Sequence, residues 1–460
     1  MAEETKMTNP GGAEAVESKA AEPVALDQAI AGSAKKLQTA LEDGNVPAIV
    51  SGLIDYAIAM GSSDIHVEPQ IKAVRIRYRV DGVLHAVANY LPRLHPAVVS
   101  RIKIISNLKL DEQRIPQDGR AEFTAVEPVT GRKIEADLRV STFPTPYGEK
   151  VVLRILDRTR HIPALRDLGL RGRNSAVFEK AIKQPNGIIL VSGPTGSGKT
   201  TTLYSALDVL NEEAVNILTI EDPVEYKMEG LSQSQVRPDI GYTFATGLRT
   251  ALRQDPDIIM IGEMRDMETI EIAVRAALTG HLVFSTIHTN SAVDSIIRLQ
   301  DMGVPGYLIA AAVRVILAQR LLRQLCPDCA IEVELEPGEI SDLVSTLATV
   351  MDQLSAEQIQ ALEKIKAKKK LLKGQGCDKC RRSGYRGRLA IFELLALTGD
   401  INELIVKGGT RGQFNQLAKE AGMITLKQDG FIKVLNGETT LAEVYRVAAE
   451  QEELAKRKVA

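Results

Sequence analysis

A glycine-rich octapeptide directly after an apolar run constrains the fold of this 460-residue chain more than any other feature. Residues 188–191 (IILV) predict a buried strand, and residues 193–200 (GPTGSGKT) match the pattern G-x-x-x-x-G-K-[ST]. Glycines let the backbone curl so that successive N–H groups face one anion, and the helix predicted over residues 200–210 offers its N-terminus to that anion. We therefore expect nucleotide phosphates to be held by the loop and the start of the helix: Gly193, Pro194, Thr195, Gly196, Ser197, Gly198, Lys199, Thr200 and Thr201.

The last side chains of the loop have separate expected roles. Lys199 has the reach to contact the β- and γ-phosphates, and the hydroxyl of Thr200 is suited to binding Mg²⁺. ATP and Mg²⁺ are therefore the expected cofactors. The alternative is a chance glycine-rich turn, which is disfavoured because a predicted strand precedes the motif and a predicted helix follows it.

Hydrolysis also needs a carboxylate that positions the attacking water. The apolar run 258–261 is followed closely by Glu263, and the carboxyl ends of parallel strands form the ligand-binding edge of such sheets. Glu263 is therefore the main candidate, while Gly262 occupies the position where a second, magnesium-binding acid is usual. The alternative is that Glu263 only caps a helix predicted over residues 268–278.

Two more polar residues follow predicted strands. Glu221 comes after the run 216–220, and His288 ends the run 281–288. We expect both side chains at the same sheet edge as Glu263. For His288 a purely structural histidine is an equally good interpretation.

Arginines are a further requirement, because charge that develops on the transferred phosphoryl group is commonly met by a guanidinium. Arg139 and Arg154 lie in predicted strands ahead of the P-loop region, and Arg249, Arg253 and Arg265 lie within it. For any one of them, a surface salt bridge is the alternative.

Strands alternate with helical stretches from residue 187, which predicts an α/β, RecA-like P-loop ATPase core with a parallel sheet. Ahead of it, arginines alternate with apolar residues over 74–80 before an Asp-Gly turn, which is typical of a smaller α+β domain with antiparallel strands. After Cys326 the chain is expected to be mostly helical. The expected organisation is a disordered acidic tail (1–24), an α+β domain (25–157), a linker or surface loop (158–172), the ATPase core (173–325), a tetracysteine zinc module (326–395) and a helical C-terminal region (396–460).

The four cysteines form two C-x₂-C pairs, Cys326 with Cys329 and Cys377 with Cys380. In a reducing compartment, such spacing favours a metal over disulfides. Two pairs supply the four ligands of a tetrahedral Zn²⁺ ion, and a site closed by protein ligands is structural rather than catalytic. Four free thiols are the alternative.

Composition limits the possible partners. The formal net charge is −2 and aromatic residues make up 4% of the chain, which disfavours a stable nucleic-acid partner. No apolar run approaches the roughly 20 residues that span a bilayer, and the N-terminus lacks a signal-peptide core. We therefore expect a cytoplasmic protein that meets the membrane only through partners. A nucleic-acid motor and a nucleotide-gated scaffold without turnover are the competing functional interpretations.

Several motifs together carry a family resemblance. GPTGSGKTTTLYSAL, LTIEDPVEY, LRQDPDIIMIGEMRD and TGHLVFSTIHTNSA resemble, in order, the Walker A, Asp box, Walker B and His box of the secretion superfamily of traffic ATPases. SSDIHVEP, RYRVDGVL and RIPQDGR resemble the PAS-like N-terminal domain of the same family. The tetracysteine pairs, GYRGR and IFE resemble its type II secretion and type IV pilus assembly members, because retraction members usually lack the cysteines.

This resemblance implies a homo-hexameric motor that powers assembly of type IV pili or type II secretion pseudopili. It implies docking on an inner-membrane platform protein from the cytoplasmic side, and a power stroke in which two domains close on ATP. The stretch before residue 46 is too short for the further docking domain of many members, so docking by another route is expected. The resemblance supports roles for Lys199, Thr200, Glu221, Glu263 and His288, and it places Arg139 and Arg154 at the positions of nucleotide-contacting arginines.

Overall fold

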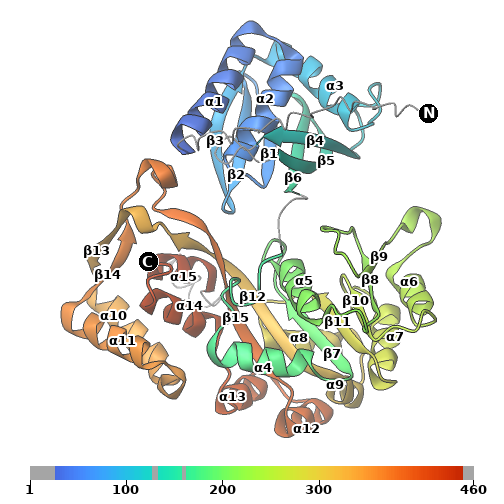
Figure 1. The fold of residues 1–460 in the computed structure, drawn as a ribbon, viewed down its shortest axis with the longest axis vertical. Coiled ribbons are helices and arrows are strands. Elements are labelled where there is room, and N and C mark those ends of the chain that lie inside the picture. Colours follow the sequence, from blue (N-terminus) through green and yellow to red (C-terminus); the bar gives the residue numbers. More distant parts are fainter. Residues whose placement is uncertain (1–25, 127–132, 158–161, 449–460) are drawn as a thin grey trace, which may run out of the picture. The chain divides into compact units, whose positions relative to one another are not determined.

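The computed structural model describes residues 26–126, 133–157 and 162–448 (Figure 1). The tail predicted over residues 1–24 lies outside them. The chain forms two compact units, Met1–Asp157 and Arg158–Ala460. Within the described ranges, no helix combines the length and the apolar character needed to cross a membrane.

The first unit is an antiparallel sheet in the order β3-β2-β1-β6-β5-β4 with helices packed on one face. Its described elements are α1 (Leu26–Asp43), α2 (Val46–Ala59), β1 (Asp64–Pro69), β2 (Val74–Val80), β3 (Val83–Tyr90), α3 (His95–Ile105), β4 (Gln117–Val126), β5 (Lys133–Thr145) and β6 (Gly148–Asp157). Side chains alternate between the two faces of a strand. Val74, Ile76 and Tyr78 of β2 are therefore buried against the helices, and the arginines between them lie on the opposite face.

A seven-stranded sheet organises the second unit in the order β15-β12-β7-β11-β10-β8-β9. All neighbouring strands run parallel except β15, which is antiparallel to β12. Its strands are β7 (Gly187–Ser192), β8 (Ile217–Glu221), β9 (Ser232–Gln235), β10 (Ile258–Ile261), β11 (Leu282–Ile287), β12 (Val313–Leu325) and β15 (Tyr385–Ala396).

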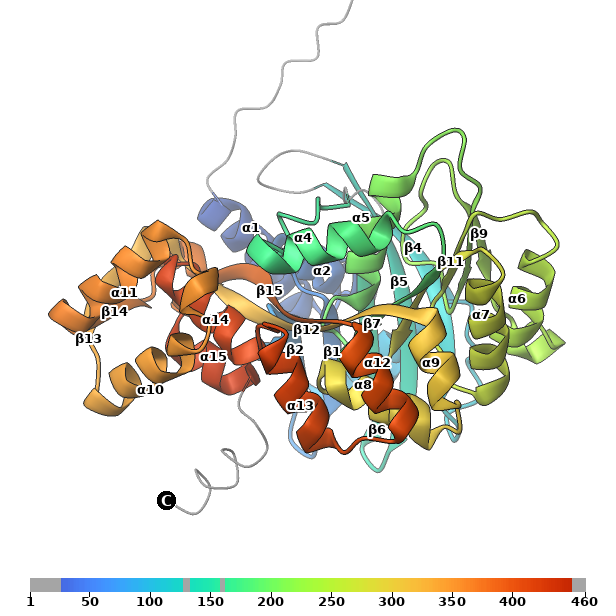
Figure 2. The same ribbon diagram turned by 90° about the horizontal axis from the view of Figure 1, so that it is seen from below.

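Helices cover both faces of this sheet, as Figure 2 shows. One face carries α4 (Gly172–Ile182) and α5 (Lys199–Leu210). The other carries α6 (Phe244–Ala251), α7 (Met267–Leu278), α8 (Ala292–Asp301) and α9 (Gly306–Ala312). Strands β7, β10 and β11 are buried over their whole length, which explains their continuous apolar sequences.

The prediction of a mostly helical chain after Cys326 is wrong in part. β13 (Ala330–Glu334) and β14 (Lys370–Gly374) pair as a ribbon, and β15 pairs with β12 in the central sheet. The sheet therefore continues past residue 325, inside the segment assigned to the zinc module. The reason is physical: the apolar run 389–395 (LAIFELL) suits a buried helix and a buried strand equally well, so periodicity could not decide between them.

The remaining helices complete the second unit. Between β13 and β14 lie α10 (Pro337–Ala348) and α11 (Ala356–Lys368). After β15 come α12 (Gly399–Lys407), α13 (Arg411–Glu420), α14 (Leu426–Leu435) and α15 (Leu441–Ala448). A cluster of buried residues from α10, α11, α14 and α15 packs against the carboxyl half of β12 and the start of β15.

The described part of the predicted linker belongs to the second unit. Leu165 and Leu170 are buried in the same apolar cluster as α4 and α5. Ala390 of β15 donates its backbone N–H to the carbonyl of Leu168 over 3.0 Å. Residues 162–171 are therefore part of the packed core rather than a free connection.

Candidate active site

The glycine-rich loop joins β7 to α5 at the carboxyl edge of the parallel strands. Gly193 and Gly198 have φ of 151° and 89°, in the region that disfavours side chains. A Cβ would lie 2.4 Å from Ser197 Oγ if added to Gly193, and 2.9 Å from Gln319 Nε2 if added to Gly198. The backbone therefore requires glycine at both positions. Of the other predicted phosphate-binding residues, Pro194, Thr195 and Gly196 are exposed, Thr200 and Thr201 are half-buried, and Ser197 is buried.

Lys199 is buried inside this loop. Its ammonium donates to the carbonyls of Gly193 and Pro194, over 3.0 and 3.2 Å. Burial lowers the pKa of Lys199, the nearby charge of Glu263 opposes that shift, and the charge of Arg320 adds to it. Both hydrogen-bond partners are neutral, so an anion in the loop is a stronger partner for this cation than either carbonyl.

Glu263 and His288 meet at the same edge. Glu263 follows β10, His288 follows β11, and His288 Nε2 lies 3.5 Å from Glu263 Oε2. The guanidinium of Arg265 contacts the other carboxylate oxygen. Burial lowers the pKa of His288 and the charge of Lys199 lowers it further, although Glu263 opposes the shift. These shifts favour the neutral form of the His288 imidazole, which lies beside an acid and within the field of Lys199.

The interpretation of Glu263 as a helix cap is wrong. The N-cap of α7 is Asp266, whose Oδ1 accepts the backbone N–H of Thr269 over 2.8 Å. Thr269 Oγ1 also donates to Asp266 Oδ2 over 3.1 Å. Glu263 lies three residues before that cap, and its side chain contacts His288 and Arg265 instead.

Glu221 ends β8 at the same edge, but it is 2% exposed and its carboxylate is occupied. Thr219 Oγ1 donates to it over 2.5 Å, Gln233 Nε2 donates over 3.2 Å, and the Tyr204 hydroxyl donates to its other oxygen. Burial raises the pKa of Glu221 while these donors oppose the shift. Unlike Glu263, Glu221 is enclosed among polar donors beneath α5.

Arg139 and Arg154 belong to the first unit. They face each other on neighbouring strands β5 and β6, on the sheet face opposite the helices. Arg154 Nε donates to Asp64 Oδ1 over 3.0 Å, and Asp64 also pairs with Arg79. The strand pairing therefore brings together the two arginines that the sequence placed 15 residues apart.

Two residues at this edge were missed by sequence reasoning. Gln319 and Arg320 extend β12 just beyond Ala318, which pairs with Ser192 ahead of the phosphate loop. Gln319 Oε1 accepts the hydroxyl of Thr202 on α5 over 2.7 Å. The available signal was a polar Gln-Arg pair directly after the apolar run 315–318, the same pattern that identified Glu263.

The four cysteine sulfurs lie within 4.8 Å of one another. The Sγ atoms are 3.9 Å apart for Cys326 and Cys377, and 3.7 Å apart for Cys329 and Cys380 and for Cys377 and Cys380. Zn–S bonds of about 2.3 Å in a tetrahedron require S–S distances of about 3.8 Å. The donor set and its spacing therefore fit a zinc ion, and the fold brings the two pairs together across 47 intervening residues that include α10 and α11.

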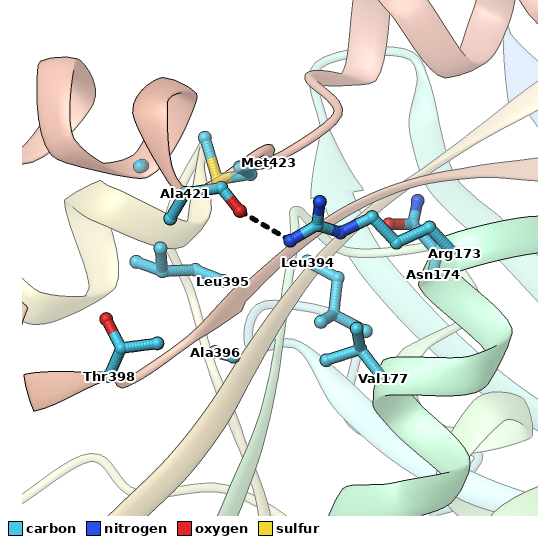
Figure 3. Close-up of a pocket in the computed structure, with 10 residues that line it drawn as sticks. Arg173, Asn174, Val177, Leu394, Leu395, Ala396, Thr398, Ala421 and Met423 are labelled. Atoms are coloured by element: carbon cyan, nitrogen blue, oxygen red, sulfur yellow. Dashed lines mark hydrogen bonds between the residues drawn. The ribbon is translucent and has the colours of Figure 1, made fainter. Parts of the chain in front are cut away.

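A separate small pocket lies between α4, the end of β15 and the end of α13 (Figure 3). Its walls are largely apolar, with Val177, Leu394 and Met423 among them. The guanidinium of Arg173 crosses it and donates to the carbonyl of Ala421. The residues that line it do not include any from the phosphate loop, so it is distinct from the edge described above.

Comparison with known proteins bears directly on this arrangement. A family described as "Type II/IV secretion system protein" matches residues 39–446, which include the whole of the glycine-rich loop and the strand ends beside it. The chain belongs to this family. The resemblance to the secretion ATPase family is thereby confirmed.

Individual members of the type II/IV secretion family are similar over most of their length. Type II secretion system ATPase E of Vibrio cholerae is 43% identical over 411 residues, covering 89% of this chain and 76% of that protein. Type IV pilus assembly ATPase PilB of Myxococcus xanthus is 44% identical over 409 residues, covering 89% and 69%. The crystal structure of the pilus retraction motor PilT with bound ADP matches with a TM-score of 0.54 at 28% identity, covering 88% of this chain and 98% of that one.

Proposed function

We propose that this chain is an ATP-hydrolysing motor that works as a homo-hexamer and powers assembly of type IV pili or type II secretion pseudopili. The observation that carries the proposal is the meeting of Glu263 and His288, 3.5 Å apart, within the electrostatic field of the phosphate-loop residue Lys199. Family membership and the relatives ATPase E and PilB support the cellular role.

The proposed reaction converts ATP and water to ADP and phosphate. The loop N–H groups and Lys199 bind the phosphates, and Thr200, on the first turn of α5, would hold Mg²⁺, which would neutralise phosphate charge. Glu263 accepts a hydrogen bond from the attacking water and orients it. Arg265 and His288 restrain the Glu263 side chain from two sides, so that little reorganisation is needed at the moment of reaction.

Glu221 takes a supporting part in this proposal. The Tyr204 hydroxyl that donates to Glu221 also accepts the backbone N–H of Glu225 over 3.2 Å. The buried carboxylate therefore holds Tyr204, and Tyr204 holds the turn that follows β8. This route gives Glu221 an influence on the site without contact with the nucleotide.

Arg139 and Arg154 are proposed to supply positive charge to the nucleotide, as the family resemblance implies. Arg139 is half-buried and Arg154 is exposed, and the two residues are paired on neighbouring strands of one sheet face. Charge that develops on the transferred phosphoryl group is best stabilised by guanidinium groups, often supplied in trans. Closure of the first unit on the ATPase core would then couple nucleotide binding to movement.

The tetracysteine cluster supports an assembly or secretion motor rather than a retraction motor. Its sulfur spacing fits a structural Zn²⁺ ion, which would clamp the β13–β14 ribbon to the start of β15. The identities of 43 and 44% to ATPase E and PilB exceed the 28% to PilT. We further propose that the motor works at the cytoplasmic side of the inner membrane, bound to a platform protein of the machine.

Phosphate release by the purified full-length chain tests the function. Wild type, Lys199→Ala, Glu263→Gln and Arg139→Ala are assayed over a protein concentration series, with light scattering to measure assembly. We expect specific activity to rise with assembly and all three variants to lose it while still assembling. Arg101→Ala is the matched control, because this exposed arginine lies on α3 at the opposite face of the same sheet. Activity independent of assembly, with Arg139→Ala normal, would refute the hexameric motor.

A further inference from the structure

Arg320 lies in the middle of β12, two residues beyond the pairing of Ala318 with the last residue of β7, and its guanidinium contacts the turn that follows β11. Its Nη2 donates to both the backbone carbonyl and the side-chain Oδ1 of Asn290, over 2.8 and 3.1 Å. Its Nη1 donates to the carbonyl of Gln319 over 3.0 Å. The guanidinium is therefore fixed on its own strand and on Asn290 at the same time.

Asn290 is only two residues beyond His288, so the hydrogen bonds from Arg320 hold the turn that carries the imidazole. The far end of the turn is anchored as well. Glu393 of β15 accepts the backbone N–H of Ala292, the first residue of α8, over 2.8 Å. The turn from His288 to α8 is thus held at its middle by a cation and at its end by a buried acid.

The surrounding charges show that Arg320 belongs to the phosphate-binding edge. Burial lowers the pKa of Arg320, and Glu393 and Asp294 oppose the shift. The charge of Arg320 in turn helps to lower the pKa of Lys199. A second cation therefore stands near the phosphate-loop lysine, where bound phosphates would stabilise both.

The preceding residue connects the same strand to the phosphate loop. Successive side chains of a strand point to opposite faces. Gln319 accordingly reaches α5, where it accepts the hydroxyl of Thr202, while Arg320 reaches the turn before α8. One short piece of β12 is therefore attached to both the loop that binds phosphates and the turn that carries His288.

We propose that Arg320 is a positioning residue for ATP hydrolysis, which holds the turn 288–290 so that His288 stays beside Glu263. The inference deepens the proposed function and rests on it. The planar fork of the guanidinium matters here, because Nη2 meets both acceptors of Asn290 while Nη1 meets the carbonyl of Gln319. A lysine keeps the charge but cannot reproduce that fork.

The chain supplies a closely matched control on the same strand. Arg314 also binds an asparagine through its backbone carbonyl and its Oδ1, since Nε and Nη2 donate to Asn186 over 3.2 and 3.0 Å. Asn186 precedes β7, so this pair lies at the amino edge of the sheet, away from the phosphate loop. Substitution of Arg314 and substitution of Arg320 each remove the hydrogen bonds between an arginine and an asparagine, and the two sites differ in their position on the sheet.

The experiment uses the full chain and measures kcat, KM for ATP and the Kd of ADP for Arg320→Gln, Arg320→Lys, Arg314→Gln and Arg314→Lys. We expect both Arg320 variants to lose about tenfold or more in kcat, with KM and Kd changed by less than about threefold. The Arg314 variants should keep kcat within about twofold. Amide hydrogen exchange of residues 288–292 should quicken in the Arg320 variants and stay unchanged in the Arg314 variants.

A double variant separates positioning from a general loss of structure. If Arg320 acts through His288, then His288→Ala with Arg320→Gln should be no more than about threefold slower than His288→Ala alone. Three results would each overturn the inference. They are a double variant whose loss in kcat is the product of the two single losses, a normal kcat in Arg320→Lys, and losses in kcat in the Arg314 variants as large as those in the Arg320 variants. A wild-type chain without turnover would overturn the proposed function instead, and hydrogen exchange would still test whether Arg320 holds the turn.

Discussion

Glu263 and Asp266 are acids three residues apart, and the structure separates their roles. Asp266 caps α7, whereas Glu263 contacts His288 and Arg265. We therefore expect Asp266→Ala to reduce stability and keep catalysis, and Glu263→Gln to keep stability and lose catalysis.

The sizes of the two effects follow from the contacts. Removing the Asp266 side chain leaves the Thr269 N–H without its 2.8 Å acceptor, at a cost of about 1 kcal/mol. In a unit of about 300 residues that corresponds to a Tm lower by about 1.5–2 °C. The partners of Glu263 are exposed, with 63% of the Arg265 side chain accessible, so its ion pairs contribute at most about 1 kcal/mol. Loss of its charge should lower kcat by about 10²–10⁴-fold.

Thermal unfolding and phosphate release are measured on the same preparations. Glu271→Gln is the control, since this exposed acid lies on the outer side of α7 and should change neither quantity. The reasoning is refuted if Asp266→Ala abolishes turnover at an unchanged Tm. It is equally refuted if Glu263→Gln lowers the Tm and retains its kcat.

Three further predictions concern the second unit. Wild type should carry about one zinc ion per chain, and Cys380→Ser should lose it on dialysis; equal zinc contents by elemental analysis would contradict the site. Burial opposes ionisation of Glu443, but hydrogen bonds led by Arg446 lower its pKa to about 2. The stabilisation that Glu443 contributes is therefore present above about pH 4.5 and lost as the pH falls toward 2. The difference in Tm between wild type and Glu443→Gln should shrink over that range, and a constant difference would contradict the prediction. Phe392→Ala on β15, where the ring is 0% exposed, should cost about 3–5 kcal/mol in denaturant unfolding, while Val406→Ala at a 57% exposed site should stay within about 0.5 kcal/mol; similar losses would show that β15 is not a core strand.

Much of the candidate site could be located from sequence because its signals are local. The glycines at 193, 196 and 198 permit the positive φ angles that the loop has. Glu263 and His288 each follow a short apolar run, and parallel strands end at one edge of a sheet whatever their order. The prediction that Glu263 and His288 lie close together therefore did not depend on the order of the strands in the sheet.

Other features depend on which side chains meet, and no local pattern reports that. Glu221 and Glu263 both follow apolar strands, yet one is enclosed by Tyr204, Thr219 and Gln233 while the other reaches His288. The difference arises because one side chain turns beneath α5 and the other stays at the rim. Burial, which raises the pKa of Glu221, is a property of the packed fold.

The sequence by itself determined the chemistry of this protein: a loop that can bind phosphates, acids and a histidine at strand ends, and four thiols in two pairs. Tertiary structure alone decided that β15 completes the central sheet, that Asp266 and not Glu263 caps α7, and that Arg320 holds the turn after His288. The physical reason is the separation in sequence between the residues that interact. Backbone conformation and strand ends are set by neighbours along the chain, whereas strand order, burial and the partners of a long side chain are set by residues that are distant in sequence.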